Sequence, residues 1–162
     1  MRAWLALCML LPLAAWAQAG GMEDPVQLPE YPKPENYLAL DVSGSASFDF
    51  FVDAKSVSVG KDGVVRYSLI ARSPDGAMNV SYEGILCSGR QYRIYAFGRS
   101  DKTWYESRVS AWQPMPSDAR NAQRSVLYRD FFCPFGGIIH TPDEGVQALR
   151  RGGHPQVTVP RI

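Results

Sequence analysis

Cysteine and histidine are scarce in this chain, and their scarcity removes several classes of protein. The 162 residues include three cysteines and two histidines. No Cys-x-x-Cys pair occurs, which excludes a dithiol redox motif and a Cys-x-x-Cys-His haem attachment site. A predicted helix separates His140 from His154, so the two rings lack the close spacing of a local metal site. We therefore expect no metal and no other cofactor.

Catalytic and nucleotide-binding glycine motifs are also missing. The chain has no Gly-x-Ser-x-Gly nucleophile elbow, and Gly136-Gly137 is not followed by the Lys-Ser/Thr of a phosphate-binding loop. Neither sign of charge prevails, because Lys and Arg total 17 while Asp and Glu total 16. A nearly neutral chain lacks the broad positive surface that captures nucleic acid, so we expect no nucleic-acid partner.

Long apolar runs are absent, and the one short run lies at the N-terminus. A membrane-spanning helix needs about 20 apolar residues, and Leu5–Leu13 is much shorter. Arg2 precedes this run and Ala15-Trp16-Ala17 follows it, which is the order of elements in a secretory signal peptide. We expect a signal peptide over residues 1–17, cleaved between Ala17 and Gln18, and a soluble exported product without a transmembrane segment.

Cleavage at that point leaves only two cysteines. It removes Cys8, so Cys87 and Cys133 remain in a chain that has entered an oxidising compartment. The simplest prediction is one disulfide between them, worth about 4 kcal/mol on the chain-entropy model. The alternative is a free Cys133 thiol that His140 activates as a nucleophile.

Proline sets the N-terminal part of the exported chain apart. Each proline lacks a backbone donor and fixes φ, so a segment rich in them forms neither a helix nor a central strand. We expect an extended Pro-rich arm over residues 18–46, with Tyr37–Leu40 tucked against the domain, and a single domain over residues 47–162. A surface tail without a docking role is the alternative. The prolines that define the arm are Pro25, Pro29, Pro32 and Pro34.

The pattern between Ser47 and Glu106 predicts a β-meander. Apolar stretches alternate with turn-forming segments such as Ser73-Pro74-Asp75-Gly76 and Ser88-Gly89. With loops of that length, Arg66 lies opposite Glu83 and forms a cross-strand ion pair. One face of the sheet then collects the larger apolar side chains, namely Tyr67, Leu69, Met78, Val80, Tyr82, Tyr95, Phe97 and Trp104.

Two helices are predicted in the C-terminal third. Ser117 is the expected cap of a helix that runs to Phe131. The second helix follows Thr141-Pro142-Asp143-Glu144, which combines an N-cap, a first-turn proline and a capping-box glutamate, and it stops at Gly152-Gly153. The expected fold class is α+β, an antiparallel β-meander covered on one face by two short C-terminal helices.

Cationic and aromatic side chains interleave along one stretch of the meander. Such a row binds anionic or sugar-like ligands through charge and ring stacking, although alternation on any half-buried sheet also produces it. We take Arg90, Tyr92, Arg93 and Arg99 as candidate ligand-binding residues, with Lys102, Tyr95 and Trp104 beside them. A catalytic pair among Asp49, Asp53, Glu83 and Glu106 is a further possibility, but no spacing singles out two of them.

The chain resembles a known family in three segments. These are Ser81-Tyr82-Glu83-Gly84-Ile85-Leu86-Cys87, the following Arg93-Ile94-Tyr95-Ala96-Phe97-Gly98 with Trp104, and Tyr128-Arg129-Asp130-Phe131-Phe132-Cys133. They are similar to the CNP1-like family of exported beta-proteobacterial proteins. The resemblance implies a Gram-negative envelope setting and carries no catalytic residue.

Together these observations predict a non-enzymatic, soluble periplasmic domain that binds or scaffolds at the cell envelope. Its expected partner is an envelope protein or an anionic or sugar-like ligand. The alternative is a small periplasmic hydrolase or thiol enzyme that uses Cys133 and His140 or an Asp/Glu pair.

Overall fold

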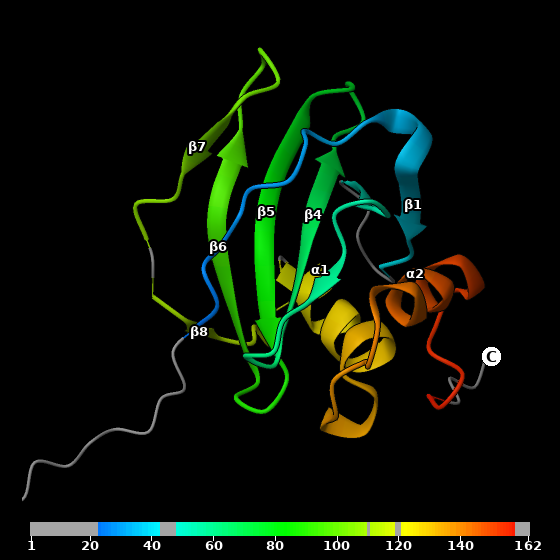
Figure 1. Cartoon of the computed structure of the whole chain (residues 1–162). Helices are drawn as coiled ribbons and strands as arrows, with labels where there is room; N and C mark the ends of the chain where they lie inside the picture. Colours follow the sequence, from blue (N-terminus) through cyan, green and yellow to red (C-terminus); the bar gives the residue numbers. More distant parts are fainter. Residues whose placement is uncertain (1–22, 43–47, 110, 119–120, 158–162) are drawn as a thin grey trace, which may run out of the picture.

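The computed structural model describes residues 23–42, 48–109, 111–118 and 121–157 (Figure 1). The predicted signal peptide, with its cleavage site at Ala17 and Gln18, lies outside the described residues. Within them, an antiparallel sheet carries short helices on one face, so the predicted α+β class is confirmed.

Eight strands form one sheet in the described part of the chain. In spatial order the main strands are β1-β2-β4-β5-β6-β7, while β3 pairs with β4 and β8 pairs with β6. Strands β4 to β7 are neighbours both in the chain and in the sheet, which is the predicted meander. The bounds are β1 Tyr37–Leu40, β2 Asp49–Asp53, β3 Ser58–Val59, β4 Val64–Arg72, β5 Met78–Leu86, β6 Gln91–Gly98, β7 Trp104–Glu106 and β8 Gln113–Pro114.

The second predicted helix is confirmed. Helix α2 spans Pro142–Arg151, and the Thr141 hydroxyl accepts a hydrogen bond from the Glu144 backbone N–H at 3.2 Å. Gly152 ends the helix in the left-handed conformation with φ of 74°. The start, first turn and stop therefore all lie where the local sequence signals place them.

The first predicted helix has a different start. Asn121 rather than Ser117 is its N-cap, and α1 runs over Ala122–Val126. The Asp118 carboxylate accepts the backbone N–H of Asn121 at 3.1 Å, so Asp118 closes the turn before the helix. The helix continues as the π-helix η3 (Leu127–Phe132), followed by the 3-10 turn η4 (Pro134–Gly136); a further 3-10 turn, η1 (Pro34–Asn36), precedes β1.

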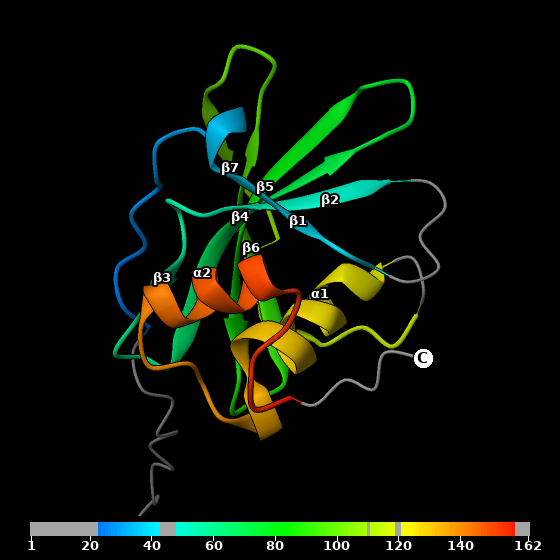
Figure 2. The ribbon, with the colours of Figure 1, turned by 90° about the vertical axis from the view of Figure 1, so that its right-hand side faces the viewer.

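The helices cover the β1–β5 side of one sheet face (Figure 2). The core forms there, where the Tyr67 ring lies 5.3 Å from the Phe132 ring. Burial of each large apolar side chain contributes about 1.5–3 kcal/mol. The main core side chains are Leu40, Val52, Val65, Tyr67, Leu69 and Ile85 from the sheet and Leu127, Phe131, Phe132, Ile139, Val146 and Leu149 from the helical layer.

The predicted register between β4 and β5 is wrong by one residue. Tyr67 pairs with Glu83, and Arg66 pairs with Gly84. The connecting loop also includes Ala77, whose carbonyl accepts the Ser73 N–H at 2.9 Å. A slip of one residue moves side chains to the other face of a sheet. Tyr67 therefore faces the helices while Tyr82 faces the opposite side, and the predicted Arg66–Glu83 ion pair does not form.

The register between β5 and β6 is correct as far as Glu83, which pairs with Ile94, and shifts beyond it. Tyr82 pairs with Ala96, so Tyr95 is an extra residue and forms a β-bulge. In the next pair of strands Gly98 lies opposite Trp104, so Trp104 faces the arm with Tyr82 and not the helices with Tyr67.

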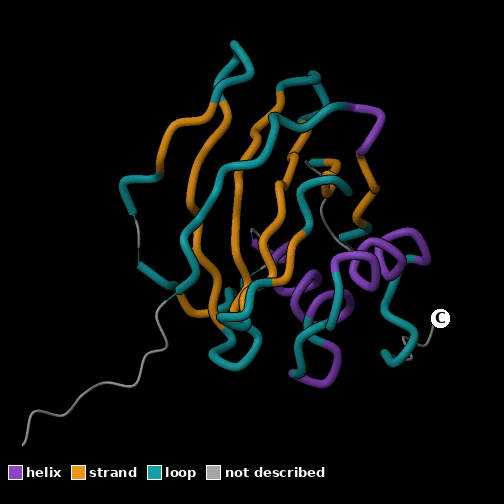
Figure 3. The backbone as a smooth tube through the Cα atoms, in the orientation of Figure 1, coloured by secondary structure: helices purple, strands orange, loops and turns teal. Residues whose placement is uncertain are grey.

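The N-terminal arm crosses the sheet face that the helices leave free (Figure 1, blue). The Trp104 indole N–H donates to the Pro29 carbonyl at 2.9 Å, and the Tyr31 ring lies 5.3 Å from the Trp104 ring. Tyr37–Leu40, expected to tuck against the domain, pairs with β2 as strand β1. The sheet thus lies between the arm on one face and the helices on the other (Figure 3, strands orange, helices purple).

Candidate ligand-binding groove

An open groove lies on the helix-side face of the sheet, beyond the end of the helical layer. Its volume is about 540 Å³, within the range of ligand pockets. Its lining comes from β6 and β7, from residues 107–109 and 111, and from the start of β8. The lining side chains are Tyr92, Ile94, Phe97, Tyr105, Ser107, Arg108, Val109, Ala111 and Gln113.

The β-bulge at Tyr95 gives the groove its apolar floor. Tyr92 and Ile94 pair with Ile85 and Glu83, so they share the helix-side face. Uninterrupted alternation would place Ala96 next on that face and Phe97 on the other. Because the bulge adds one residue, Phe97 pairs with Ser81 and returns to the groove side.

Aromatic and cationic groups form the outer part of the groove. The Phe97 and Tyr105 rings stack with centroids 5.6 Å apart, and Tyr105 is 42% exposed. The Arg99 guanidinium lies 5.2 Å from the Tyr105 ring centroid. Arg108 lines the groove and belongs to none of the ion pairs found among the described residues. The surface can therefore bind an apolar group and an anion together.

A buried ion pair supports the inner end of the groove. Arg124 donates to both carboxylate oxygens of Glu83, each at 2.7 Å. Its guanidinium also lies 4.6 Å from the ring centroid of Tyr92, which lines the groove. The Glu83 carboxylate accepts two further bonds, from the Ser81 and Tyr67 hydroxyls. Tyr92 is thus backed by a hydrogen-bonded charge pair rather than by loose apolar packing.

Burial and neighbouring charges determine the protonation states of Arg124 and Tyr67 in this network. Burial disfavours the charged form of Arg124, but the facing Glu83 carboxylate outweighs burial and raises the pKa of Arg124 above its usual value. Burial, and then the negative charge of Glu83, raise the pKa of Tyr67 well above 10.0. Arg124 therefore stays charged at neutral pH, and Tyr67 stays a neutral hydrogen-bond donor.

The predicted ligand-binding row does not converge on one surface. Arg90 lies in the turn after β5 and packs over the Tyr128 ring, while Arg99 lies at the far end of β6. Tyr92 faces the groove, whereas Arg93 faces the arm and pairs with Glu23 at 2.6 Å. Only Tyr92 and Arg99 therefore belong to the groove region.

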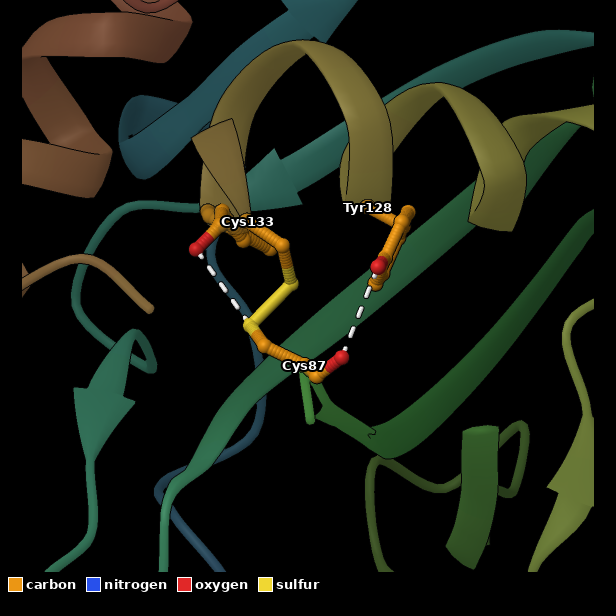
Figure 4. The surroundings of a disulfide bond; sticks show 4 residues. Cys87, Tyr128 and Cys133 are labelled. Carbon is orange, nitrogen blue, oxygen red and sulfur yellow. Dashed lines mark hydrogen bonds between the residues drawn. A yellow bond between two sulfur atoms is a disulfide. The ribbon is translucent and has the colours of Figure 1, made fainter. Parts of the chain in front are cut away.

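The two predicted partner cysteines meet where β5 ends and η3 ends (Figure 4). Their Sγ atoms are 2.09 Å apart, the distance of a disulfide bond. The Cys87 sulfur also lies 3.6 Å from the Phe132 carbonyl, and the Tyr128 hydroxyl donates to the Cys87 carbonyl. Cys133 is 1% exposed, and its sulfur is bonded to that of Cys87. In this state it therefore has no free thiol that His140 could activate as a nucleophile.

The histidines have separate structural roles. The exposed His140 donates its backbone N–H to Glu144 at 2.6 Å. The buried His154 contacts another Glu144 oxygen through Nε2 at 2.9 Å, and its Nδ1 accepts the Gln156 N–H. Since Nδ1 is an acceptor, Nε2 carries the proton and donates it to Glu144. No cluster of three or more metal-ligating side chains occurs among the residues that the structure describes.

The four carboxylates considered as a catalytic pair have different surroundings. Glu83 is bound to Arg124, and Asp49 forms an exposed ion pair with Arg72 at 2.9 Å. Asp53 is buried, which raises its pKa above the ordinary value. Glu106 lies exposed on β7. The structure thus places them in four separate environments.

Comparison with known proteins identifies the family. A sequence model of the CNP1-like family matches residues 18–150. The chain belongs to this family. Cryptic neisserial protein 1 from Neisseria gonorrhoeae is 30% identical over 112 residues, covering 61% of this chain and 54% of the relative. The chain thus spans about half the length of that curated relative. No solved structure matches.

Sequence reasoning placed only part of the groove of this CNP1-like domain. Phe97 was expected on the same face as Tyr67 and lies there, but the β-bulge that brings it to the same face as Tyr92 was not predicted. Arg124, which supports Tyr92 from behind, was not considered. A signal for the bulge does exist, because glycine inside a strand often marks a bulge or a close approach. A Cβ on Gly84 would lie 2.6 Å from the Tyr95 hydroxyl oxygen.

In the described residues, no helix has the length and apolar character needed to cross a bilayer.

Proposed function

We propose that this CNP1-like domain is a periplasmic binding module without a catalytic role, and that its groove takes an apolar ligand carrying an anionic group. One observation carries the proposal: an aromatic floor next to an arginine that has no carboxylate partner among the described residues. Tyr105 and Val109 expose 42% and 63% of their surfaces there. Ligand grooves typically combine apolar and aromatic lining with a few placed polar or charged groups, as this groove does.

The side chains of the groove suit both the apolar part and the anionic group of the proposed ligand. Removing apolar surface from water contributes about 25 cal/mol per Å², and the rings of Phe97 and Tyr105 offer such surface. Arg108 supplies a positive charge to the lining, and within the part of the chain that the structure describes it forms no ion pair. Arg99 adds a second charge, although the nearby Asp101 offsets part of it. An amphipathic anion satisfies this combination better than a neutral sugar does.

The groove is tested with cis-parinaric acid, a fluorescent fatty acid, and with its neutral methyl ester. We expect saturable binding of the acid by the wild-type protein and weaker binding of the ester. Val109→Glu places a carboxylate in the groove and should weaken binding of the acid by at least about tenfold. Met78→Glu is the matched control, because Met78 is 55% exposed and lies at the β5 start, outside the groove lining.

Equal binding by wild-type protein and Val109→Glu would show that the probe binds elsewhere. An ester that binds as well as the acid would remove the anionic part of the proposal. Absence of saturable binding to the wild type would contradict the groove as a site for this class of ligand.

The proposed location has its own test. We expect the protein recovered from a periplasmic fraction to begin at Gln18, and its intact mass to show alkylation of Cys87 and Cys133 only after reduction. A chain that retains residues 1–17 and is recovered only from the cytoplasm would contradict the periplasmic assignment. A cysteine that is alkylated without reduction would contradict the disulfide.

A further inference from the structure

A second polar site lies on the opposite sheet face, beneath the arm. One Glu23 carboxylate oxygen lies 2.6 Å from Arg93 Nη1, and the other lies 3.2 Å from Arg66 Nη2. The Tyr95 hydroxyl donates to the second oxygen at 2.5 Å. Arg66 also pairs with Asp62 at 2.5 Å. Three groups from β4 and β6 thus surround one carboxylate of the arm.

The pocket is built into the sheet. The Arg66 and Arg93 side chains are only 6% and 25% exposed. Among the described residues, the buried Nε atoms of both guanidinium groups have no hydrogen-bond partner. Gly84, which pairs with Arg66 and Arg93 in the sheet, leaves space that the Tyr95 ring fills. Arg66 also pairs with Asp62, and both guanidinium groups lie over the Tyr95 ring, so these contacts within the domain do not depend on the arm.

The charge balance depends on Glu23. Arg66 and Arg93 bring two positive charges, and Asp62 brings one negative charge. With Glu23 the site is neutral, and without it one poorly solvated positive charge remains. Such a charge favours the binding of another anion. Burial, and then the hydrogen bond to Glu23, raise the pKa of Tyr95, so its hydroxyl remains a donor to that anion.

The arm itself is held the way an extended peptide ligand is held. Among the described residues, no backbone-to-backbone hydrogen bond joins residues 23–33 to the sheet. Beside Glu23, Asp24 anchors the arm twice: its N–H donates to the Asp62 carboxylate at 2.9 Å and its carboxylate accepts the Lys61 N–H at 3.0 Å. Further along, the Pro29 carbonyl accepts from Trp104, and the Tyr31 hydroxyl donates to the Arg99 carbonyl. Each of these contacts is a separate hydrogen bond that another extended chain can make in its place.

We propose that the pocket formed by Arg66, Arg93 and Tyr95 is a carboxylate-binding site for an extended acidic segment of a partner protein, and that the arm occupies it in cis. The partner segment would place an Asp or Glu side chain where Glu23 lies. This site is independent of the groove, because it lies on the other face of the sheet. A tethered segment acts at an effective concentration in the millimolar range, so an external segment competes well only after the arm is weakened.

The experiment uses the full exported chain and a synthetic peptide that copies residues 22–31, measured by isothermal titration calorimetry. Glu23→Ala empties the pocket and should bind the peptide at least about tenfold more tightly than the wild type does. Glu30→Ala is the matched control, since the Glu30 side chain is 89% exposed and its ion pair is with Lys33, within the arm. It should behave like the wild type.

The specificity of the pocket is tested with a second peptide in which glutamine replaces the glutamate that corresponds to Glu23. We expect this peptide to lose most of its affinity for Glu23→Ala. Equal binding of the two peptides, or equal binding by wild type and Glu23→Ala, would overturn the carboxylate site. Glu23→Gln repeats the test with a side chain of similar size if the alanine variant does not fold. If the wild-type protein forms a dimer that the peptide dissociates, the external segment belongs to a second copy of this chain, and the proposal of a different partner protein is wrong.

Discussion

The buried Glu83–Arg124 pair should behave as one energetic unit. Both contacts between them are 2.7 Å, and their side chains are 0% and 10% exposed. Removing one member of a buried pair typically costs about 3–5 kcal/mol, because the other charge is left without its partner. Ser81 and Tyr67 still donate to Glu83 when Arg124 is gone. We therefore expect Arg124→Met to lower the free energy of unfolding by about 3 kcal/mol, the lower end of this range.

A double-mutant cycle gives the coupling. We expect Glu83→Gln to cost a similar amount, and Glu83→Gln/Arg124→Met to cost about 1–3 kcal/mol less than the sum of the two single changes. The free energies of unfolding are measured by urea denaturation at pH 7 with the disulfide intact. Arg72→Met is the control, since its ion pair with Asp49 is exposed and should contribute at most about 1 kcal/mol. Single changes that cost less than about 1 kcal/mol, or costs that simply add, would refute the reasoning.

Two further predictions concern the disulfide and the Glu144 carboxylate of α2. Replacing Cys87 and Cys133 by alanine should lower the free energy of unfolding by about 4 kcal/mol on the chain-entropy model, given their separation of 46 residues; a loss below about 1 kcal/mol in urea denaturation would contradict a formed bridge. Burial alone would raise the pKa of Glu144, but hydrogen bonds from His140 and His154 outweigh it and lower that pKa below 4.5. The stability that Glu144 contributes is therefore fully present above pH 4.5 and is lost as the pH falls through the lowered value. Glu144→Gln should remove this part of the acid dependence, and an unchanged profile of urea midpoint against pH would count against it.

Local signals predicted local features well. The capping residues Thr141 and Glu144 and the stop at Gly152 lie within a few residues of the helix they define. The pairing of Cys87 with Cys133 needed no geometry, because the predicted cleavage removes Cys8 and two cysteines allow one bridge. Such features depend on short-range chemistry that a single sequence displays directly.

Register was harder to predict, because one residue decides it. Alanine is not a typical turn residue, yet Ala77 belongs to the loop after β4. Tyr95 is the extra residue of a bulge inside a regular-looking strand. Each shift moved aromatic side chains to the other face. The groove and the Glu83–Arg124 pair follow from these shifts, so they could not be predicted from a regular alternation.

The residues of the predicted binding row lie on two surfaces for a simpler physical reason. Tyr92 and Arg93 are adjacent in a strand, so their side chains must point to opposite faces. Arg90 and Arg99 stand near the two ends of β6. The residues are close in sequence but serve two different surfaces, the groove and the arm site.

The contact between β1 and α2 has a consequence for how the protein is made. The first strand of the sheet packs against the last helix, and Leu40 shares a core with Val146 and Leu149. Among the described elements, the C-terminal helix therefore closes the part of the core that the first strand opens. A nascent chain that has not yet been extended through residue 151 cannot complete this layer. This layer of the core therefore forms only after α2 has been delivered, and a truncation before α2 should loosen the first strand as well.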